Sequence, residues 1–169
     1  MKKRLPELII TDIDGVWTDG GMYYGQTGNE WKKFNTYDSA GIIFAKELGI
    51  EVAVITSEDT KIVTRRCKKL KIKYLYQGVN DKLKIATDLC HKIDVEFDRV
   101  AYIGDDIGDL SLLRMVGISG APLNAQNYIK SEVDIVTKKS GGEGAFREFV
   151  ESIIGINRIT NILKESYSG

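Results

Sequence analysis

The sequence predicts an α/β fold, in which a doubly wound, mostly parallel sheet is covered by helices on both faces and carries an inserted β-hairpin. Two observations lead to this prediction. Short apolar runs rich in Val, Ile and Tyr alternate with segments of helical apolar spacing. Polar side chains, mainly carboxylates, directly follow several of these runs. Ligands bind at the carboxyl ends of the strands in such sheets, so a functional site is expected there.

Composition limits the domain count and the class of protein. The 169 residues are 43% hydrophobic, enough for one domain, placed at 1–155, with a tail at 156–169. Basic and acidic residues balance at 24 each, which argues against nucleic-acid or anionic-membrane binding. No membrane-spanning run or leader pattern is present, so we expect a cytoplasmic protein. Cys67 and Cys90 lack metal-type spacing and are expected to be reduced, with His91 at the surface.

The first apolar run begins at Leu8 and ends in two aspartates, Asp12 and Asp14, followed by Gly15. The run is typical of a buried strand, and glycine lets the chain leave the sheet in a conformation closed to other residues. Residues two apart in a strand share a face, so the two carboxylates lie on one side. They repel one another unless a cation lies beside them. A polar strand end that caps the next turn is the alternative.

The segment at about residues 20–36 has the pattern of a β-hairpin, with two strand-like runs around a glycine-containing turn. An isolated two-stranded ribbon is marginally stable and cannot bury many aromatic side chains. This ribbon carries Tyr23, Tyr24, Trp31 and Phe34. We therefore expect it to pack against the body of the domain or against another subunit.

Helix and strand patterns then alternate to the end of the chain. Apolar residues three and four apart predict helices at 39–48, 60–70, 81–91, 110–115, 125–130 and 145–154. Short buried runs predict strands at 52–55, 74–76, 100–103, 117–119 and 133–136. Residues 156–167 have the pattern of a weak amphipathic helix. No G-x-G-x-x-G sequence follows the first strand, which disfavours a dinucleotide-binding fold.

Four polar clusters follow predicted strands, and the carboxyl ends of parallel strands share one crevice. The clusters are Asp12 with Asp14, Thr56 with Ser57, Lys82 alone, and Asp105 with Asp106 and Asp109. Mg²⁺ prefers hard carboxylate oxygens, and lysine and hydroxyl donors beside them form a phosphate pocket. A carboxylate nucleophile beside such a metal ion and a phosphate can form an aspartyl-phosphate intermediate.

Together these clusters resemble the four motifs of the haloacid dehalogenase superfamily of phosphohydrolases, over nearly the whole chain. Residues 38–41, 77–83 and 141–148 and the Asp-Gly-Gly start of the hairpin are similar to one branch of it. That branch comprises capless, tetrameric phosphatases of 3-deoxy-D-manno-octulosonate 8-phosphate and of nine-carbon 2-keto-3-deoxy acid 9-phosphates. The resemblance implies a Rossmann-like core and a sugar-acid phosphate as substrate.

The resemblance also implies roles for the clustered residues. Asp12 would attack phosphorus, and Asp14 would protonate the leaving oxygen and then accept a proton from water. An acid at pH 7 needs a raised pKa whereas a metal-bound carboxylate stays ionised, so only one of the pair can be the donor. The Mg²⁺ ligands would be Asp12, the carbonyl of Asp14, Asp105 and, in the surrounding shell, Asp106.

The remaining implied roles concern the phosphoryl oxygens. Thr56, Ser57 and Lys82 would bind them, and Asp109 would orient Lys82 or a metal-bound water. For Thr56 or Lys82 taken alone, an ordinary residue after a strand is the alternative. For Asp106, the alternative is a cap on the helix that starts near Gly108.

Too few residues separate the first two motifs for the helical cap domain that screens the active site in many relatives. An aspartyl phosphate must be protected from bulk water. We therefore expect hairpins from several subunits to pack together in a homotetramer, with a neighbouring chain lining the pocket. A hairpin folded back on its own domain is the alternative.

Two departures from the eight-carbon enzymes favour a nine-carbon substrate. Those enzymes usually carry arginine where this chain has Glu58 and Glu143. Both differences remove a cation from the side expected to bind the sugar carboxylate. The predicted substrate is 2-keto-3-deoxynononate or N-acylneuraminate 9-phosphate, with the eight-carbon 8-phosphate as the alternative. Glu58, Arg66 and Lys69 are expected to contact the sugar acid, the two cations within the chain or across a subunit boundary, although a solvated helix face would also explain these cations.

Two non-enzymatic functions compete with this prediction. A phosphoreceiver module also combines a doubly wound sheet with clustered aspartates and a lysine, but its acidic pair and its phosphorylated aspartate lie on different strands. The Asp12-x-Asp14 pattern on one strand argues against it. A catalytically silent interaction domain is the second competitor, and the presence of every expected catalytic residue argues against that.

Overall fold

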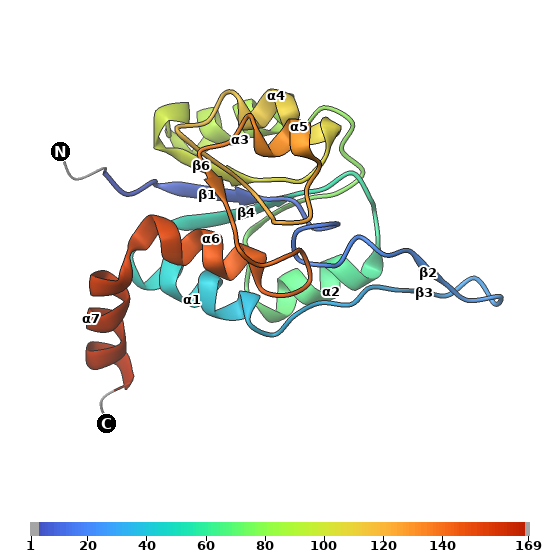
Figure 1. The fold of residues 1–169 in the computed structure, drawn as a ribbon, viewed down its shortest axis with the longest axis horizontal. Coiled ribbons are helices and arrows are strands. Elements are labelled where there is room, and N and C mark those ends of the chain that lie inside the picture. Colours follow the sequence, from blue (N-terminus) through green and yellow to red (C-terminus); the bar gives the residue numbers. More distant parts are fainter. Residues whose placement is uncertain (1–3, 168–169) are drawn as a thin grey trace.

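Six parallel strands form the central sheet, in the order β5-β4-β1-β6-β7-β8 (Figure 1). The structure is a computed structural model and describes residues 4–167. The strands are β1 (Leu8–Thr11), β4 (Glu51–Ile55), β5 (Tyr74–Tyr76), β6 (Val100–Ile103), β7 (Ile118–Ala121) and β8 (Ile135–Val136). Strand β1 lies at the centre, and its residues are completely buried because both of its faces are covered.

Helices pack on both faces of the sheet, so the predicted doubly wound α/β fold is confirmed (Figure 1). One face carries α1 (Asp38–Glu47), α2 (Lys61–Lys69), α6 (Ala145–Ile154) and α7 (Ile156–Tyr167). The other carries α3 (Lys82–Ile93), α4 (Leu110–Leu113) and α5 (Asn127–Lys130), and the 3₁₀ turns η1 (Phe97–Arg99) and η2 (Ile107–Asp109) flank β6. Alternate residues of β1 enter different cores: Ile9 packs with Phe146 of α6, whereas Ile10 packs with Leu89 of α3.

The C-terminal segment is an ordered helix whose packing the sequence did not define. Helix α7 contacts α1 and α6, and it buries Ile159 and Ile162 in the same core as Ile9. Residues 168–169 of the predicted tail lie outside the described part of the chain. Within residues 4–167, no helix combines the length and apolarity needed to cross a bilayer.

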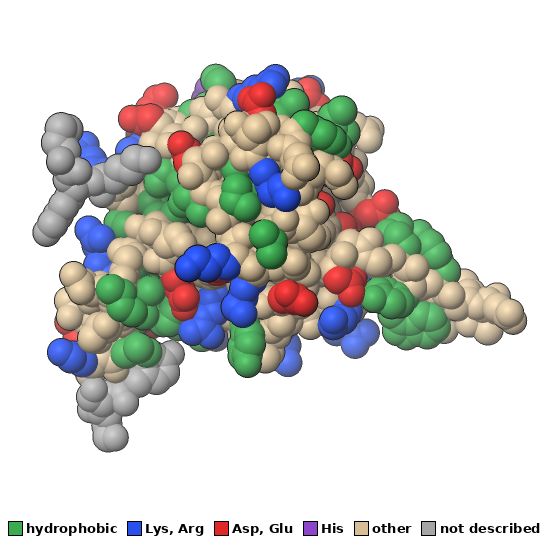
Figure 2. All heavy atoms as spheres, viewed as in Figure 1, with side chains coloured by type: hydrophobic (Ala, Val, Ile, Leu, Met, Phe, Trp, Pro, Cys, Tyr) green, Lys and Arg blue, Asp and Glu red, His purple; other side chains and the backbone are tan. Residues whose placement is uncertain are grey.

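The hairpin is a narrow ribbon that extends away from the sheet (Figure 1). Its strands β2 (Tyr23–Tyr24) and β3 (Glu30–Trp31) pair over only two residues each, fewer than the sequence pattern suggested. The ribbon is tied to the domain by the bridge between Thr18 and Phe34. Tyr24 is 69% exposed and Trp31 is 55% exposed, and the apolar surface of the ribbon is visible in Figure 2. Between β1 and β4, the structure contains only this ribbon and α1, with no cap domain.

Candidate active site

Nine of the predicted site residues line one pocket of about 290 Å³ at the carboxyl edge of the sheet. They come from the ends of β1, β4, β5 and β6, which the parallel topology brings to the same edge. Those residues are Asp12, Asp14, Thr56, Ser57, Glu58, Lys82, Asp105, Asp106 and Asp109. Gly20 and Met22, at the start of the hairpin, complete the wall beside them.

Asp12 is held at the centre of the pocket by the main chain. Its N–H donates to the Ile103 carbonyl at 3.1 Å, which continues the β1–β6 ladder by one residue. Its own carbonyl accepts from the Thr11 hydroxyl at 2.8 Å, and that hydroxyl accepts from the Trp17 indole N–H at 3.0 Å. The Asp12 side chain is 9% exposed, so a carboxylate stands at the pocket floor with little access to water.

Gly15 allows two loops to meet above Asp12. It has φ +83°, and a Cβ built on it would lie 2.0 Å from Asp105 Oδ2. The loop at 141–142 also packs directly on this turn, since a Cβ on Gly141 would lie 1.8 Å from the Gly15 carbonyl oxygen. Any side chain at Gly15 would therefore displace the Asp105 carboxylate from its place opposite Asp12.

Asp109 organises the loop after β6. Its Oδ2 accepts from the backbone N–H groups of Asp105 at 2.8 Å and Asp106 at 3.0 Å, and its Oδ1 accepts from Lys82 and from the Tyr102 hydroxyl. With four donors, both of its oxygens are occupied, so Asp109 acts as the anchor of the site. The Asp106 side chain instead accepts from the Ile107 N–H and caps η2.

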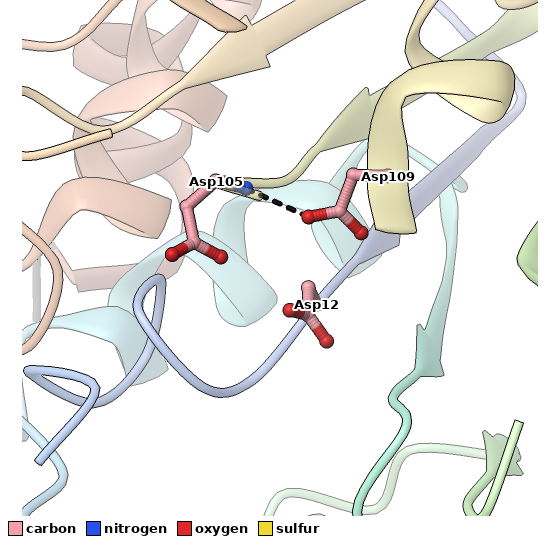
Figure 3. A group of neighbouring side chains, drawn as sticks. All are labelled: Asp12, Asp105 and Asp109. Atoms are coloured by element: carbon pink, nitrogen blue, oxygen red, sulfur yellow. Dashed lines mark hydrogen bonds between the residues drawn. The ribbon is translucent and has the colours of Figure 1, made fainter. Parts of the chain in front are cut away.

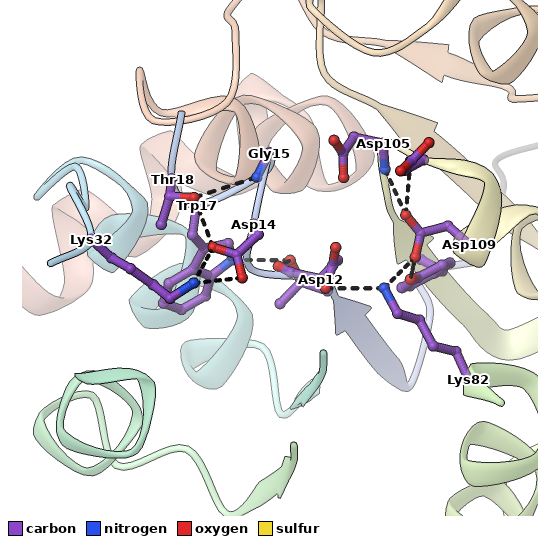
Figure 4. A network of polar contacts seen from close by, with 12 residues as sticks. Asp12, Asp14, Gly15, Trp17, Thr18, Lys32, Lys82, Asp105 and Asp109 are labelled. Atoms are coloured by element: carbon purple, nitrogen blue, oxygen red, sulfur yellow. Dashed lines mark hydrogen bonds and ion pairs between the residues drawn. The ribbon is translucent and has the colours of Figure 1, made fainter. Parts of the chain in front are cut away.

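Lys82 lies between two carboxylates, with its Nζ 2.5 Å from Asp109 Oδ1 and 3.1 Å from Asp12 Oδ1 (Figure 4). It is the first residue of α3, whose start is fixed by Asp81 accepting from the Lys84 N–H at 3.0 Å. The side chain is 5% exposed. Burial acts to lower the pKa of Lys82, but the charges of Asp12 and Asp109 outweigh it and raise the pKa, so Lys82 is a cation in this pocket.

Burial and mutual repulsion raise the pKa values of two carboxyl groups in this pocket. Burial raises the pKa of Asp12 to about 7, with the charge of Asp109 adding to the rise and Lys82 opposing it. Burial raises the pKa of Asp105 to about 8, and the charges of Asp12 and Asp109 add to it. A single lysine therefore does not neutralise this group, and a further cation would be stabilised there.

Asp12, Asp105 and Asp109 each turn a carboxylate oxygen toward a common centre, and these three oxygens lie within 4.8 Å of one another (Figure 3). Asp12 Oδ1 is buried and accepts no hydrogen bond, despite the nearby Lys82. Because both Asp109 oxygens already accept hydrogen bonds, Asp12 and Asp105 are the side chains with free lone pairs. An all-oxygen donor set of this kind fits Mg²⁺.

Three further predicted residues surround the acidic centre. Thr56 is buried at the end of β4, where its N–H donates to the Tyr76 carbonyl and its carbonyl accepts from the Val79 N–H. Ser57 and Glu58 follow it, are exposed and line the pocket opening. Thr56 and Lys82 therefore line the same pocket as the acidic centre.

The structure does not bring Arg66 and Lys69 to this pocket. Both lie on α2 and line a separate groove of about 460 Å³ between that helix and the hairpin, together with Trp31 and Phe34. The Arg66 guanidinium lies over the Phe34 ring at 5.8 Å and donates to the Asn35 carbonyl. Neither cation lines the pocket that holds Asp12 in the same chain. Glu143 is likewise exposed and does not line the pocket.

The structure adds one residue that sequence reasoning missed, Lys32. Its Nζ donates to both Asp14 oxygens, at 2.7 and 2.8 Å, while the Thr18 hydroxyl donates to Asp14 Oδ1 at 3.2 Å (Figure 4). The sequence could have indicated Lys32 through the alternation of side-chain direction along the second strand of the hairpin. Residues two apart face the same side, which separates Lys32 from the exposed neighbours Trp31 and Lys33.

Comparisons with known proteins show the family to which this chain belongs. A family model of haloacid dehalogenase-like hydrolases matches residues 75–148. The 3-deoxy-D-manno-octulosonate 8-phosphate phosphatase of Escherichia coli K12 is 42% identical over 87% of this chain and 78% of its own length.

Solved structures of the same phosphatases are similar to this chain. The 3-deoxy-D-manno-octulosonate 8-phosphate phosphatase of Moraxella catarrhalis, in complex with magnesium, phosphate and KDO, superposes with a TM-score of 0.87 at 37% identity, covering 90% of this chain and 87% of its own. The cobalt-bound Haemophilus influenzae enzyme gives a TM-score of 0.86 at 38% identity, over 91% and 90%. The chain belongs to the haloacid dehalogenase superfamily, in the branch that contains the 3-deoxy-D-manno-octulosonate 8-phosphate phosphatases.

Proposed function

We propose that this enzyme is a Mg²⁺-dependent phosphatase of 2-keto-3-deoxy sugar-acid phosphates. The observation that carries the proposal is the position of Asp12, a buried carboxylate beside the Lys82 ammonium and Asp105, whose Oδ1 accepts no hydrogen bond. A nucleophile needs a free lone pair, a neighbouring cation to hold the phosphate, and little competing water. Asp12 meets all three conditions.

In the first step, an Asp12 oxygen attacks phosphorus and the bond from phosphorus to the sugar oxygen breaks. The leaving oxygen takes a proton from Asp14, which lines the same pocket two residues further along the chain. Lys82 and Thr56 bind phosphoryl oxygens, and the Lys82 ammonium offsets the charge that builds up beside Asp12.

In the second step, water attacks the phosphorus of the aspartyl phosphate and gives a proton to Asp14. The bond between phosphorus and Asp12 breaks, which releases inorganic phosphate and restores the Asp12 carboxylate and the protonated Asp14. Mg²⁺, when bound, supplies positive charge that screens the phosphoryl oxygens from the nucleophile. Asp12 and Asp105 would hold it, with the Asp14 carbonyl as an implied ligand. Asp109 would keep the loop that carries Asp105 in place.

The eight-carbon 8-phosphate is the substrate best supported, because the named relatives act on it at up to 42% identity. A nine-carbon 9-phosphate is the second candidate. It is favoured by Glu58, which lines the opening of the pocket and brings a negative charge to the side where the substrate would enter. A carboxylate there disfavours a nearby substrate carboxylate and can instead accept hydrogen bonds from additional hydroxyl groups.

Assembly is the second part of the proposal. The hairpin exposes Tyr23, Tyr24 and Trp31 on a ribbon too small to bury them, which supports packing of hairpins from several copies into a homotetramer. In such an assembly, Arg66 and Lys69 would line the pocket of a neighbouring chain and bind the sugar carboxylate there.

A panel of phosphate esters tests this function. Release of inorganic phosphate is measured from the eight-carbon 8-phosphate, the nine-carbon 9-phosphates and a hexose 6-phosphate, with Mg²⁺ and with EDTA. Metal-dependent release with a preference for the 2-keto-3-deoxy acids is expected. Equal rates on the hexose ester would contradict the substrate class, and no release from any ester would favour a silent interaction domain.

A further inference from the structure

The Lys32 ammonium is buried in a way that an ordinary surface lysine is not. Its side chain is 1% exposed, and Nζ lies 3.7 Å from Glu30 Oε1 as well as within hydrogen-bond distance of both Asp14 oxygens. The next residue, Lys33, has a side chain that is 65% exposed and reaches only to 4.0 Å from Asp19. A buried ammonium is unfavourable unless it is paired, so the ion pair with Asp14 is what makes the burial of Lys32 tolerable.

Asp14 depends on this contact for its orientation. Among the described residues, only Lys32 and the Thr18 hydroxyl donate hydrogen bonds to its carboxylate, and Lys32 alone reaches both oxygens. A carboxylate held on both oxygens by one donor has little freedom to rotate about its last side-chain bond. With Thr18 alone, at 3.2 Å on Oδ1, that rotation would be much freer.

We propose that Lys32 is a positioning residue, which the hairpin places against Asp14 so that this carboxylate faces the reacting oxygen atoms. The inference rests on the proposed role of Asp14 as proton donor and acceptor. Lys32 directly follows β3, so the ribbon that exposes Trp31 on one side delivers a cation to the active site on the other. The hairpin thus contributes to catalysis within its own chain.

An aryl phosphate such as p-nitrophenyl phosphate separates the two proton transfers. Nitrophenolate leaves without being protonated, so transfer of the phosphoryl group to Asp12 needs no acid. Hydrolysis of the aspartyl phosphate still needs Asp14 to accept a proton from water. An enzyme with a misplaced Asp14 therefore releases one nitrophenolate per site quickly and then turns over slowly.

The test uses Lys32→Met, with Lys33→Met as the matched control and Asp14→Asn as the reference for complete loss. For Lys32→Met in Mg²⁺, we expect a burst of about one nitrophenolate per site, a roughly ten- to hundredfold lower kcat and a KM within about threefold of the original. Lys33→Met should match the unchanged enzyme, and Asp14→Asn should show the same burst with slower turnover.

Two outcomes would overturn the inference: Lys32→Met turning over like the unchanged enzyme, or losing the burst together with turnover while remaining folded by circular dichroism. If Asp14→Asn itself turns over normally, the proposed role of Asp14 fails instead. Should Lys32→Met not fold, the same measurement on Lys32→Gln decides, because the shorter, neutral glutamine side chain cannot hold both Asp14 oxygens as the ammonium does. A normal kcat for Lys32→Gln without a burst would then reject the positioning role.

Discussion

The acidic pocket and the hairpin differ in how completely one chain builds them. In the pocket, Asp12, Lys82 and Asp109 are buried and in contact, and Asp109 satisfies four donors from its own chain. On the hairpin, Tyr24 and Trp31 leave more than half of their surface open. This contrast supports our proposal, in which the sheet preorganises the reacting groups and a neighbouring chain encloses the substrate.

The largest expected effect comes from the most buried part of the pocket. Asp12→Asn keeps the shape of the side chain but removes the nucleophile, so we expect kcat to fall by at least about a thousandfold. The melting temperature without metal should not fall, because one of the mutually repelling carboxylates is gone. Asp88→Asn, an exposed change on α3, is the control and should leave both quantities unchanged. Near-normal turnover by Asp12→Asn would show that Asp12 is not the nucleophile.

Metal-free stability should fall as pH rises from about 4 to about 8. The pKa is about 7 for Asp12 and about 8 for Asp105 in the fold, against 3.8 ordinarily, so the folded state binds more protons than the unfolded chain across this interval. Stability is therefore greatest below about pH 4 for these two groups and is lost as pH rises through the folded values, on the order of a few kcal/mol.

Denaturant unfolding in EDTA at pH 5.5 and 8 measures this effect, with Mg²⁺ added in parallel. Mg²⁺ should restore stability at pH 8, where Asp12 is mostly ionised and Asp105 about half ionised, because it binds their ionised forms. Equal stability at the two pH values in EDTA would contradict the raised pKa values of Asp12 and Asp105, and no response to Mg²⁺ would contradict a cation site at the acidic centre.

The hairpin is tested by removing its exposed aromatic surface. Replacing both Tyr24 and Trp31 with serine should dissociate the assembly, since central aromatic residues each contribute about 2 kcal/mol or more to protein interfaces. Sedimentation measures the oligomer, and kcat/KM for the sugar-acid phosphate should fall more than that for an aryl phosphate. Tyr128→Ser, an exposed change on α5, is the control. A parent enzyme that is monomeric and fully active would contradict the proposed role of the hairpin surface.

The smallest predicted effect concerns the choice between substrates at the opening of the pocket. Glu58→Arg should shift the ratio of kcat/KM between eight- and nine-carbon substrates toward the eight-carbon ester by about tenfold, equivalent to roughly 1.4 kcal/mol. Asp59→Arg makes the same charge change at the next position, which does not line the pocket, and should shift the ratio much less. An unchanged ratio in Glu58→Arg would remove the case for a nine-carbon substrate.

Much of the fold could be predicted because local patterns and tertiary structure agree. The buried run from Leu8 and the capped start of α3 at Asp81 are set by short-range rules of burial and hydrogen bonding. Parallel topology then brings Asp12, Lys82 and Asp105 together without knowledge of any side-chain contact. The acidic pocket was therefore accessible from the sequence.

The remaining features depend on contacts that no local pattern encodes. Lys32 and Lys33 are adjacent and chemically identical, and only the path of the hairpin decides which of them meets Asp14. The packing of α7 depends in the same way on α1 and α6 being in place. The place of Arg66, in the groove beside the hairpin of its own chain, depends on the same path.

The central claim is that Asp12 receives the phosphoryl group. The direct measurement is rapid acid quenching during turnover of ³²P-labelled p-nitrophenyl phosphate in Mg²⁺, followed by peptide mapping of the labelled residue. We predict label on the peptide containing Asp12, absent in Asp12→Asn and more abundant in Asp14→Asn, where hydrolysis of the intermediate is slowed. Turnover without any labelled peptide, or label on a residue other than Asp12, would contradict the account.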